Sequence, residues 1–292
     1  MSIKPRYYAL AVISLGVFLS ANVSADIVIS DNFDGTAGVG PALQLVTNGV
    51  DGGGGSFTNA TGVVEAGGAT NGSTSASGFN NTALVAVPSD VTAIKATFEI
   101  ASVENLLFTR SNGFFVGLVT DNNASATVFG ATATDGNGLF NNNNTSGIGL
   151  LFNSPNPIDT ALDETRVASD GATGGAVTIT GLALAAADRP AAADVEDGFT
   201  FSITLNADNT LDASTTGLTT DINATGVTVN GGVTFADFVA NGVGVSATFQ
   251  GSGGGFTADS VSVHLETAVV PEPSSLALLG LTTLGLVARR RR

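Results

Sequence analysis

Carboxylates are the side chains of this sequence that are numerous enough to suggest chemistry. The chain holds 25 Asp and Glu against 10 Lys and Arg, with one histidine and no cysteine. Calcium prefers six to eight oxygen ligands from carboxylates and carbonyls on turns. Asp31 and Asp34 belong to the opening strand pattern and the turn after it, and Asp259 belongs to the closing one. If these two strands pair, the three carboxylates converge, so the sequence predicts a structural Ca²⁺ there.

Nucleophilic and general-base chemistry has few candidates. The one histidine, His264, falls on the polar side of an alternating strand pattern, and the chain offers no thiol and no second histidine. A solvent-facing strand residue is the interpretation that this placement favours. We therefore predict no catalytic residue and no enzyme.

The charge of the body restricts its partners. Residues 26–268 carry 24 acidic side chains against four basic ones, Lys95, Arg110, Arg166 and Arg189, a net charge of −20. Such a surface repels phosphate backbones and attracts cations, so we expect no nucleic-acid partner and predict divalent cations instead. Without cysteine, neither disulfides nor thiolate sites contribute.

Short β-rich runs separated by Gly, Asn, Asp and Ser clusters predict strands. In 94–100, for example, Ile94, Ala96, Phe98 and Ile100 alternate with polar residues, which indicates one buried face. Only 235–241 favours a short helix, capped by Thr234, and the segment 194–198 is expected to be a loop. The predicted strands are 63–64, 82–87, 93–101, 113–120, 126–131, 147–152, 176–179, 199–205, 226–229, 242–250 and 257–266.

These elements predict an all-β body, an antiparallel two-sheet β-sandwich or jelly roll, with a solenoid as the alternative. The opening run 29–35, the central runs 113–119 and 147–152, the hairpin around 207–210 and the closing run 259–263 resemble concanavalin-like and laminin-G-like sandwiches. In similar modules a calcium ion ties the chain ends. The hydrolases of that group carry Glu-x-Asp-x-x-Glu on one strand, whereas Glu99 and Glu104 lack the Asp between them.

The N-terminus has the pattern of a secretory signal peptide. Lys4 and Arg6 form a basic region, residues 9–19 an apolar core, and 23–25 a small-residue cleavage site. We therefore predict a signal peptide over 1–25, expected to be helical, a mature start at Asp26, a single β-sandwich domain over 26–268, and a separate segment over 269–292.

The C-terminal segment has three parts in a fixed order. Pro271-Glu272-Pro273 is followed by the apolar run 276–288, and the chain closes on Arg289, Arg290, Arg291 and Arg292. Arginines of this kind stay on the cytoplasmic side of a membrane. The apolar run, expected to be a helix, is shorter than the roughly 20 residues that span a bilayer, which favours a transient signal over an ordinary anchor helix.

Residues 269–292 thus resemble the PEP-CTERM sorting signal of bacterial surface proteins. The resemblance implies recognition by an exosortase-type membrane enzyme, cleavage near Pro271, transient inner-membrane contact, and delivery to the cell envelope or an exopolysaccharide matrix. We accordingly expect an exported, non-catalytic surface or matrix protein.

Two other functions stay open. A lectin-like carbohydrate-binding module is the first alternative, with extracellular polysaccharide as partner, although both tyrosines lie in the signal peptide and the chain has no tryptophan for stacking on sugars. Phe114 and Phe140 are the substitutes, and both fit core or loop positions. The second alternative is a glycoside hydrolase, which needs only two carboxylates at a fixed separation.

Overall fold

The computed structural model describes most of the predicted body. It describes residues 23–36, 38–41, 43–48, 56–58, 63–65, 76–81, 84–103, 114–121, 145–153, 164–170, 177–229, 232–239, 244–252 and 256–268. Ser24–Thr267 forms one compact unit. The segments 1–22 and 269–292 and the strand predicted at 126–131 lie outside the described residues. The two processing positions, near Asp26 and Pro271, stay predictions.

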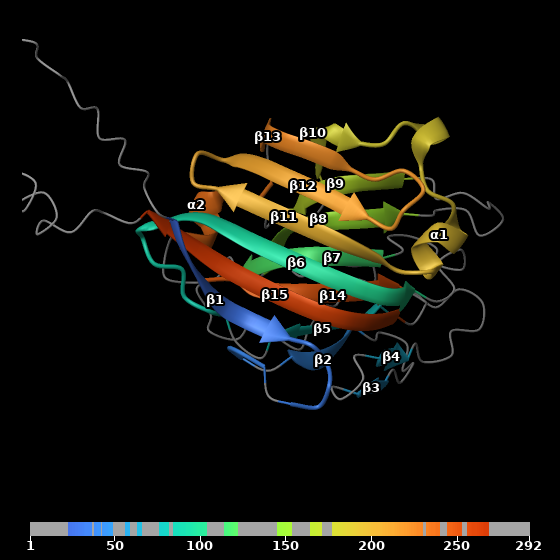
Figure 1. Ribbon diagram of the computed structural model, residues 1–292, viewed down its shortest axis with the longest axis horizontal. Helices are drawn as coiled ribbons and strands as arrows, with labels where there is room; N and C mark the ends of the chain where they lie inside the picture. Colours follow the sequence, from blue (N-terminus) through green and yellow to red (C-terminus); the bar gives the residue numbers. More distant parts are fainter. Residues whose placement is uncertain are drawn as a thin grey trace, which may run out of the picture. The chain divides into compact units, whose positions relative to one another are not determined.

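The body is built from two antiparallel sheets, which confirms the predicted β-sandwich (Figure 1). We call them sheet A and sheet B. Sheet A has the order β13 (Asn223–Thr228), β12 (Thr210–Thr216), β11 (Phe199–Asn206), β6 (Val91–Val103), β15 (Phe256–Ala268), β4 (Val63–Glu65) and β3 (Ser56–Thr58), with β1 (Val23–Asp31) also paired to β15. Sheet B has the order β10 (Val177–Ala183), β9 (Glu164–Asp170), β8 (Thr145–Asn153), β7 (Phe114–Asp121), β14 (Ser246–Ser252), β5 (Ala76–Asn81) and β2 (Leu43–Asn48).

Alternation of apolar and polar residues decides which face of sheet A is buried. The burial of β11 alternates without a break along its length, and β6 and β15 follow the same pattern with irregularities. Phe98 pairs with Phe201 on one side and with Val261 on the other. All the side chains predicted to be inside are buried: Ile94, Phe98, Phe201, Ile203, Val261 and Val263.

Phenylalanine rings join the two layers of the sandwich. The ring of Phe98 in sheet A stacks beside Phe201, with centroids 6.2 Å apart, and meets the edge of Phe249 in sheet B at 5.3 Å. Phe114 of sheet B likewise lies 5.3 Å from Phe256 of sheet A. Offset and edge-to-face pairs at these distances are favourable beyond the area they bury. Phe114 therefore belongs to the core and is not a sugar platform.

Two short helices accompany the sheets. The predicted helix is confirmed as α2 (Phe235–Val239), where Asp237 accepts hydrogen bonds from the backbone N–H and the hydroxyl of Thr234. The loop predicted at 194–198 is wrong, because Ala192–Glu196 forms helix α1. Val195 is fully buried, and Asp194 accepts a hydrogen bond from the N–H of Ala191 at 3.0 Å, so packing and a cap hold this turn. Among the described residues, no helix is long and apolar enough to cross a membrane.

The strand predicted at 82–87 is also wrong over its described part. Val85 makes one isolated bridge to Val245 and Val87 is buried, but residues 84–88 form no ladder. Pro88 has no N–H to donate, so a ladder could not continue through this position.

Candidate functional site

The predicted calcium site depends on pairing of the first and last strands, and this pairing is present. β1 lies alongside β15 in sheet A (Figure 1). Asp31 is the last residue of β1, Asp34 lies in the following turn, and Asp259 lies on β15. The strand pairing that convergence of the three carboxylates requires is therefore present.

Asp31 and Asp34 turn their carboxylates toward their own loop. Asp31 Oδ1 accepts a hydrogen bond from the N–H of Phe33 at 2.8 Å. Asp34 accepts from the N–H and hydroxyl of Thr36 and from the Asn32 amide. The hydrogen bonds from Thr36 lower the pKa of the Asp34 carboxyl below its ordinary value. These contacts fix the turn and let Phe33, at φ 50°, place its ring in the core.

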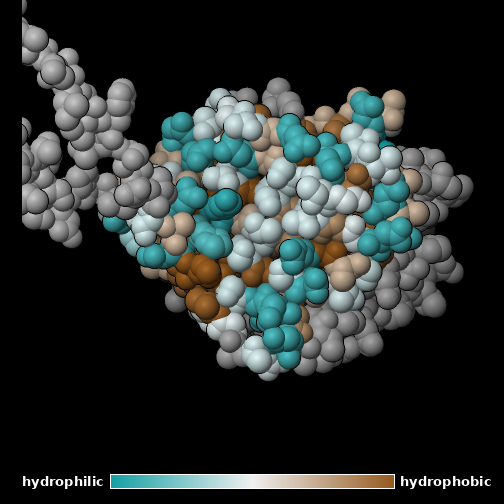
Figure 2. Space-filling view, viewed as in Figure 1, coloured by the Kyte–Doolittle hydropathy of each residue, from teal (hydrophilic) through white to brown (hydrophobic). Residues whose placement is uncertain are grey.

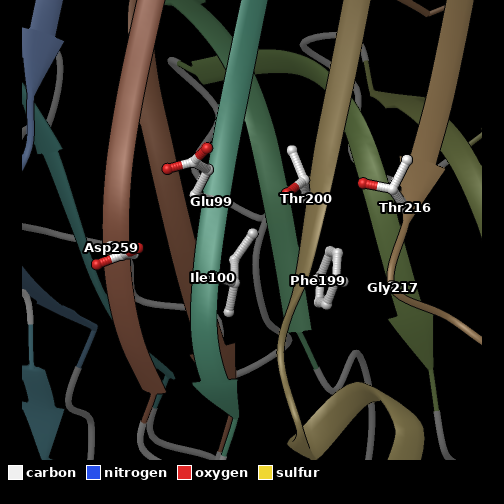
Figure 3. Close-up of a pocket in the computed structure, with 7 residues that line it drawn as sticks. All are labelled: Glu99, Ile100, Phe199, Thr200, Thr216, Gly217 and Asp259. Atoms are coloured by element: carbon white, nitrogen blue, oxygen red, sulfur yellow. The ribbon is translucent and has the colours of Figure 1, made fainter.

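Asp259 lies at an irregularity of β15. Ala258 pairs with Ile100 and Ser260 pairs with Glu99, so Asp259 is a bulge residue that has no partner on β6. It lines a shallow groove together with Glu99, Thr200, Thr216 and Gly217, at one end of sheet A (Figure 3). Glu99 accepts a hydrogen bond from the Ser260 hydroxyl at 2.7 Å.

The structure does not bring Asp31, Asp34 and Asp259 together as metal ligands. In the described part of the chain, no three or more His, Asp or Glu side chains form a group that could hold a metal ion. Asp31 and Asp34 instead accept hydrogen bonds within their own turn. The strand pairing on which the calcium hypothesis depended is present, but the three carboxylates form no metal-holding group among the described residues.

The outer face of sheet A carries rows of short hydroxyl side chains. Each row crosses β12, β11, β6 and β15 at right angles to the strands. The rows, read from β12 to β15, are Thr216–Thr200–Glu99–Ser260, Ser214–Ser202–Thr97–Ser262 and Asp212–Thr204–Lys95–His264. We call these residues the hydroxyl face. Figure 2, which views this side, shows residues of pale and hydrophilic colour over these strands and an apolar patch over β1.

The middle row consists entirely of serine and threonine. The hydroxyl oxygens of Thr97 and Ser202 are 3.3 Å apart, which is hydrogen-bonding distance. In the third row, Lys95 stands between Thr204 and His264. His264 is part-exposed on this face, as its position in the strand pattern predicted.

A second groove crosses the hydroxyl face toward the edge strand β13. It has a volume of about 440 Å³. Asp212, one of its lining residues, accepts a hydrogen bond from the N–H of Gly226 at 2.7 Å. One ammonium, one carboxylate, an amide and several hydroxyls thus line a single hollow. The lining residues are Lys95, Ser202, Thr204, Asp212, Ala213, Ser214, Asn223, Ala224 and Thr225.

Sequence reasoning missed this face for an identifiable reason. Thr200, Ser202, Ser260 and Ser262 were recognised as the polar side of their strands, but the strand after the predicted hairpin at 207–210, which is β12, was given no bounds. The rows depend on the register between neighbouring strands, and this register cannot be predicted from the sequence of a single strand. Repeated Ser and Thr at alternate positions of neighbouring strands was the available signal.

One comparison with known proteins identifies the C-terminal segment. Residues 269–292 match the PEP-CTERM protein-sorting motif. The motif implies an exported protein of the cell envelope that is sorted by an exosortase. The comparison with curated proteins gives no match.

Solved structures of lectins are similar to the chain at low identity. A lectin from Bauhinia forficata in complex with GalNAc has 14% identity and a TM-score of 0.48 over 85% of this chain and 99% of that chain. Arcelin-5, a lectin-like defence protein from Phaseolus vulgaris, has 12% identity and a TM-score of 0.47 over 85% and 100%. The Ca²⁺-bound exoplasmic/lumenal domain of VIP36 has 12% identity and a TM-score of 0.43 over 84% and 91%. These values assign no activity to this chain.

Proposed function

We propose that the body is a non-catalytic domain delivered to the cell surface or the exopolysaccharide matrix, after export and processing by an exosortase-type enzyme. The observation that carries the proposal is the sorting motif, which begins at residue 269, directly after the last strand residue, Ala268. The segment that the exosortase-type enzyme would recognise, residues 269–292, therefore directly follows the β-sandwich in the chain.

Mass spectrometry of the intact protein from envelope and matrix fractions tests this function. The expected abundant form begins near Asp26 and ends near Pro271, without the four terminal arginines. An abundant form that retains Arg289–Arg292 contradicts processing. A processed form confined to the cytoplasm contradicts export.

A second candidate function is weak contact with polysaccharide across the hydroxyl face. Its specific support is the pair of grooves on that face, whose hydroxyl, amide, carboxylate and ammonium groups can exchange hydrogen bonds with sugar hydroxyls. The twelve residues of the hydroxyl face include no Phe, Tyr or Trp side chain for stacking on a sugar ring. Binding would therefore depend on many polar contacts repeated along a polymer, each one weak.

A titration distinguishes this second function from the first. The probes are a neutral glucan oligosaccharide and a uronic-acid oligosaccharide, added to the purified protein and followed by NMR. Ser202→Ala and Thr97→Val remove hydroxyls from the middle row, and Ser89→Ala, in an exposed turn away from the face, is the matched control. Binding that weakens in the first two variants and not in the control supports the proposal. Binding that is absent, or equal in all three variants, rejects it and leaves the matrix role unaffected.

A further inference from the structure

The last two strands of the body occupy interior positions in both sheets. β14 lies between β7 and β5 in sheet B. β15 lies between β6 on one side and β4 and β1 on the other side in sheet A. Only residues 253–255 separate the two strands. We call β14 and β15 together the closing arch, because these two consecutive strands lie in the middle of different sheets (Figure 1).

The closing arch divides the other strands according to their order in the chain. Strands β1–β5, within residues 23–81, all lie on one side of it, and strands β6–β13, within residues 91–228, all lie on the other. Among the strands that the structure describes, no ladder joins the first group directly to the second. Backbone hydrogen bonding between the two groups therefore runs through the arch.

Phenylalanine rings of the arch contact both groups of strands in the core. Phe249, on the arch, has its ring centroid 6.4 Å from Phe33, which follows β1, and 5.3 Å from Phe98, which lies on β6. Its ring thus contacts one member of each group edge-on. Phe256, at the start of β15, stacks beside Phe249 at 6.1 Å and meets Phe114 of β7 at 5.3 Å. The arch therefore joins the two groups through side chains as well as through the ladders.

We propose that strands β1–β5 gain their native structure only after the closing arch has joined strands β6–β13. Pairing of distant segments is unfavourable until the strand that accepts them is in place, because loop closure costs entropy before any contact forms. The sorting motif begins at residue 269, one residue after the arch ends. The sorting signal therefore follows the last segment that the fold needs, and an incompletely exported chain lacks the strands with which β1, β4 and β5 pair in the native fold. This inference concerns when the fold forms and is independent of any ligand.

The absence of cysteine from the chain allows a direct test by thiol labelling. Three single-cysteine variants report on the two groups and the arch: Ile29→Cys on β1, Ala213→Cys on β12 and Ala258→Cys on β15. All three positions are at most 3% exposed. The purified protein is refolded from denaturant and pulsed with a thiol reagent at increasing times.

The order of protection decides the proposal. We expect position 29 to become protected no earlier than position 258, and position 213 no later than either. Adding Leu265→Ala, which weakens the arch, is expected to delay protection at positions 258 and 29 by the same factor and to leave position 213 unchanged. Val261→Ala replaces it if that variant does not fold. Protection at position 29 before position 258, or a delay confined to position 258, overturns the proposal.

Labelling of the native protein gives a second, independent measurement. We expect position 29 to label at least as fast as position 258, and both to label faster than position 213. Leu211→Ala on β12 is the matched control for Leu265→Ala, since both leucines are buried. It is expected to accelerate labelling at position 213 at least tenfold and to leave the other two positions unchanged. Equal acceleration at all three positions would show a single cooperative unit and would overturn the proposal.

Discussion

Gly117 and Gly149 lie directly opposite each other on β7 and β8, and the ring of Phe115 lies over both. A Cβ atom added at Gly149 would lie 2.6 Å from the ring carbon Cζ of Phe115 and 2.1 Å from the carbonyl oxygen of Val116. The corresponding distance from Gly117 to Cζ is 2.9 Å. Glycine is therefore required at both positions, because a backbone atom and a buried aromatic ring occupy the place of a side chain.

Replacing Gly149 by alanine should destabilise the body strongly. The clash with the Val116 carbonyl cannot be relieved by a rotamer change, so we expect a loss of roughly 1–3 kcal/mol or more in the free energy of unfolding. Gly226→Ala is the comparison, because a Cβ there meets nothing within 4 Å and only its φ of +66° opposes it. Urea denaturation measures both variants. An equal or smaller loss for Gly149→Ala would contradict the close packing.

Phe98 and Phe201 should each contribute substantially to stability. Both side chains are fully buried and their rings stack on neighbouring strands. Truncation of either to alanine is expected to cost roughly 3–5 kcal/mol. Because the two rings contact each other, the double variant should lose less than the sum of the single losses. The outward-facing Thr97→Ala serves as the control, and a loss below about 1 kcal/mol for both phenylalanines would mean that the core is wrongly assigned.

The ionised carboxylate of Asp208 should stabilise the fold at neutral pH and lose this effect in acid. The hydroxyl and N–H of Thr210 donate to its carboxylate and lower its pKa below 3.8. A carboxyl whose pKa is lower in the folded state stabilises the fold above the unfolded-state value and loses this effect as the pH falls through the folded value. The stability difference between the protein and Asp208→Asn should therefore be constant near neutral pH and shrink below pH 3.8. A difference that grows on acidification contradicts the assigned hydrogen bonds.

We expect no specific effect of calcium at Asp31, Asp34 and Asp259. Calcium should change the stability of the body only as other salts do, through ionic strength. These residues form no metal-holding group, while the net charge of −20 responds to screening by any salt. Asp259→Asn is therefore expected to leave the calcium-dependent change in melting temperature unaltered. Differential scanning calorimetry in calcium and in sodium chloride at matched ionic strength provides the measurement. A calcium response that shrinks in this variant would restore the calcium site.

Deletion of Arg289–Arg292 should impair sorting without affecting the fold. The arginines lie outside the β-sandwich, and positive residues hold a segment on the cytoplasmic side of the membrane. We expect the unprocessed chain to accumulate, with an unchanged melting temperature for the purified body. Substitution by four lysines, which keeps the charge, should restore processing. Normal processing of the deletion would remove the topological role of the arginines.

The fold was largely predictable where large apolar residues alternate. β6, β11 and β15 were expected from positions such as Phe98, Phe201 and Val263, and the register confirms their common face. The hairpin around 207–210 was expected, but β12 was given no bounds, because its inward positions are Leu211, Ala213 and Thr215, a weak apolar pattern. The strands at 43–48, 76–81 and 164–170 were missed as well. Their formation depends on pairing with neighbours that local sequence does not reveal.

The candidate site was less predictable than the fold. The sorting motif was recognised from its residues, because it acts as a linear signal. Pairing of β1 with β15 was considered as a condition for the calcium site, but the turn in which Asp34 accepts hydrogen bonds from Thr36 was not considered. A short polar side chain such as Asp can accept hydrogen bonds from its own backbone or bind a distant ligand. Sequence spacing does not show which of these two interactions forms.

The hydroxyl face also has a thermodynamic consequence for whatever touches it. Long side chains such as lysine and glutamate lose up to about 2 kcal/mol of rotamer freedom when a contact immobilises them. The middle row, from Ser214 to Ser262, contains only short side chains that have little such freedom to lose. A molecule that contacts this row therefore causes only a small loss of side-chain entropy for each residue. Even shallow and transient contacts can form and break with little change in side-chain entropy.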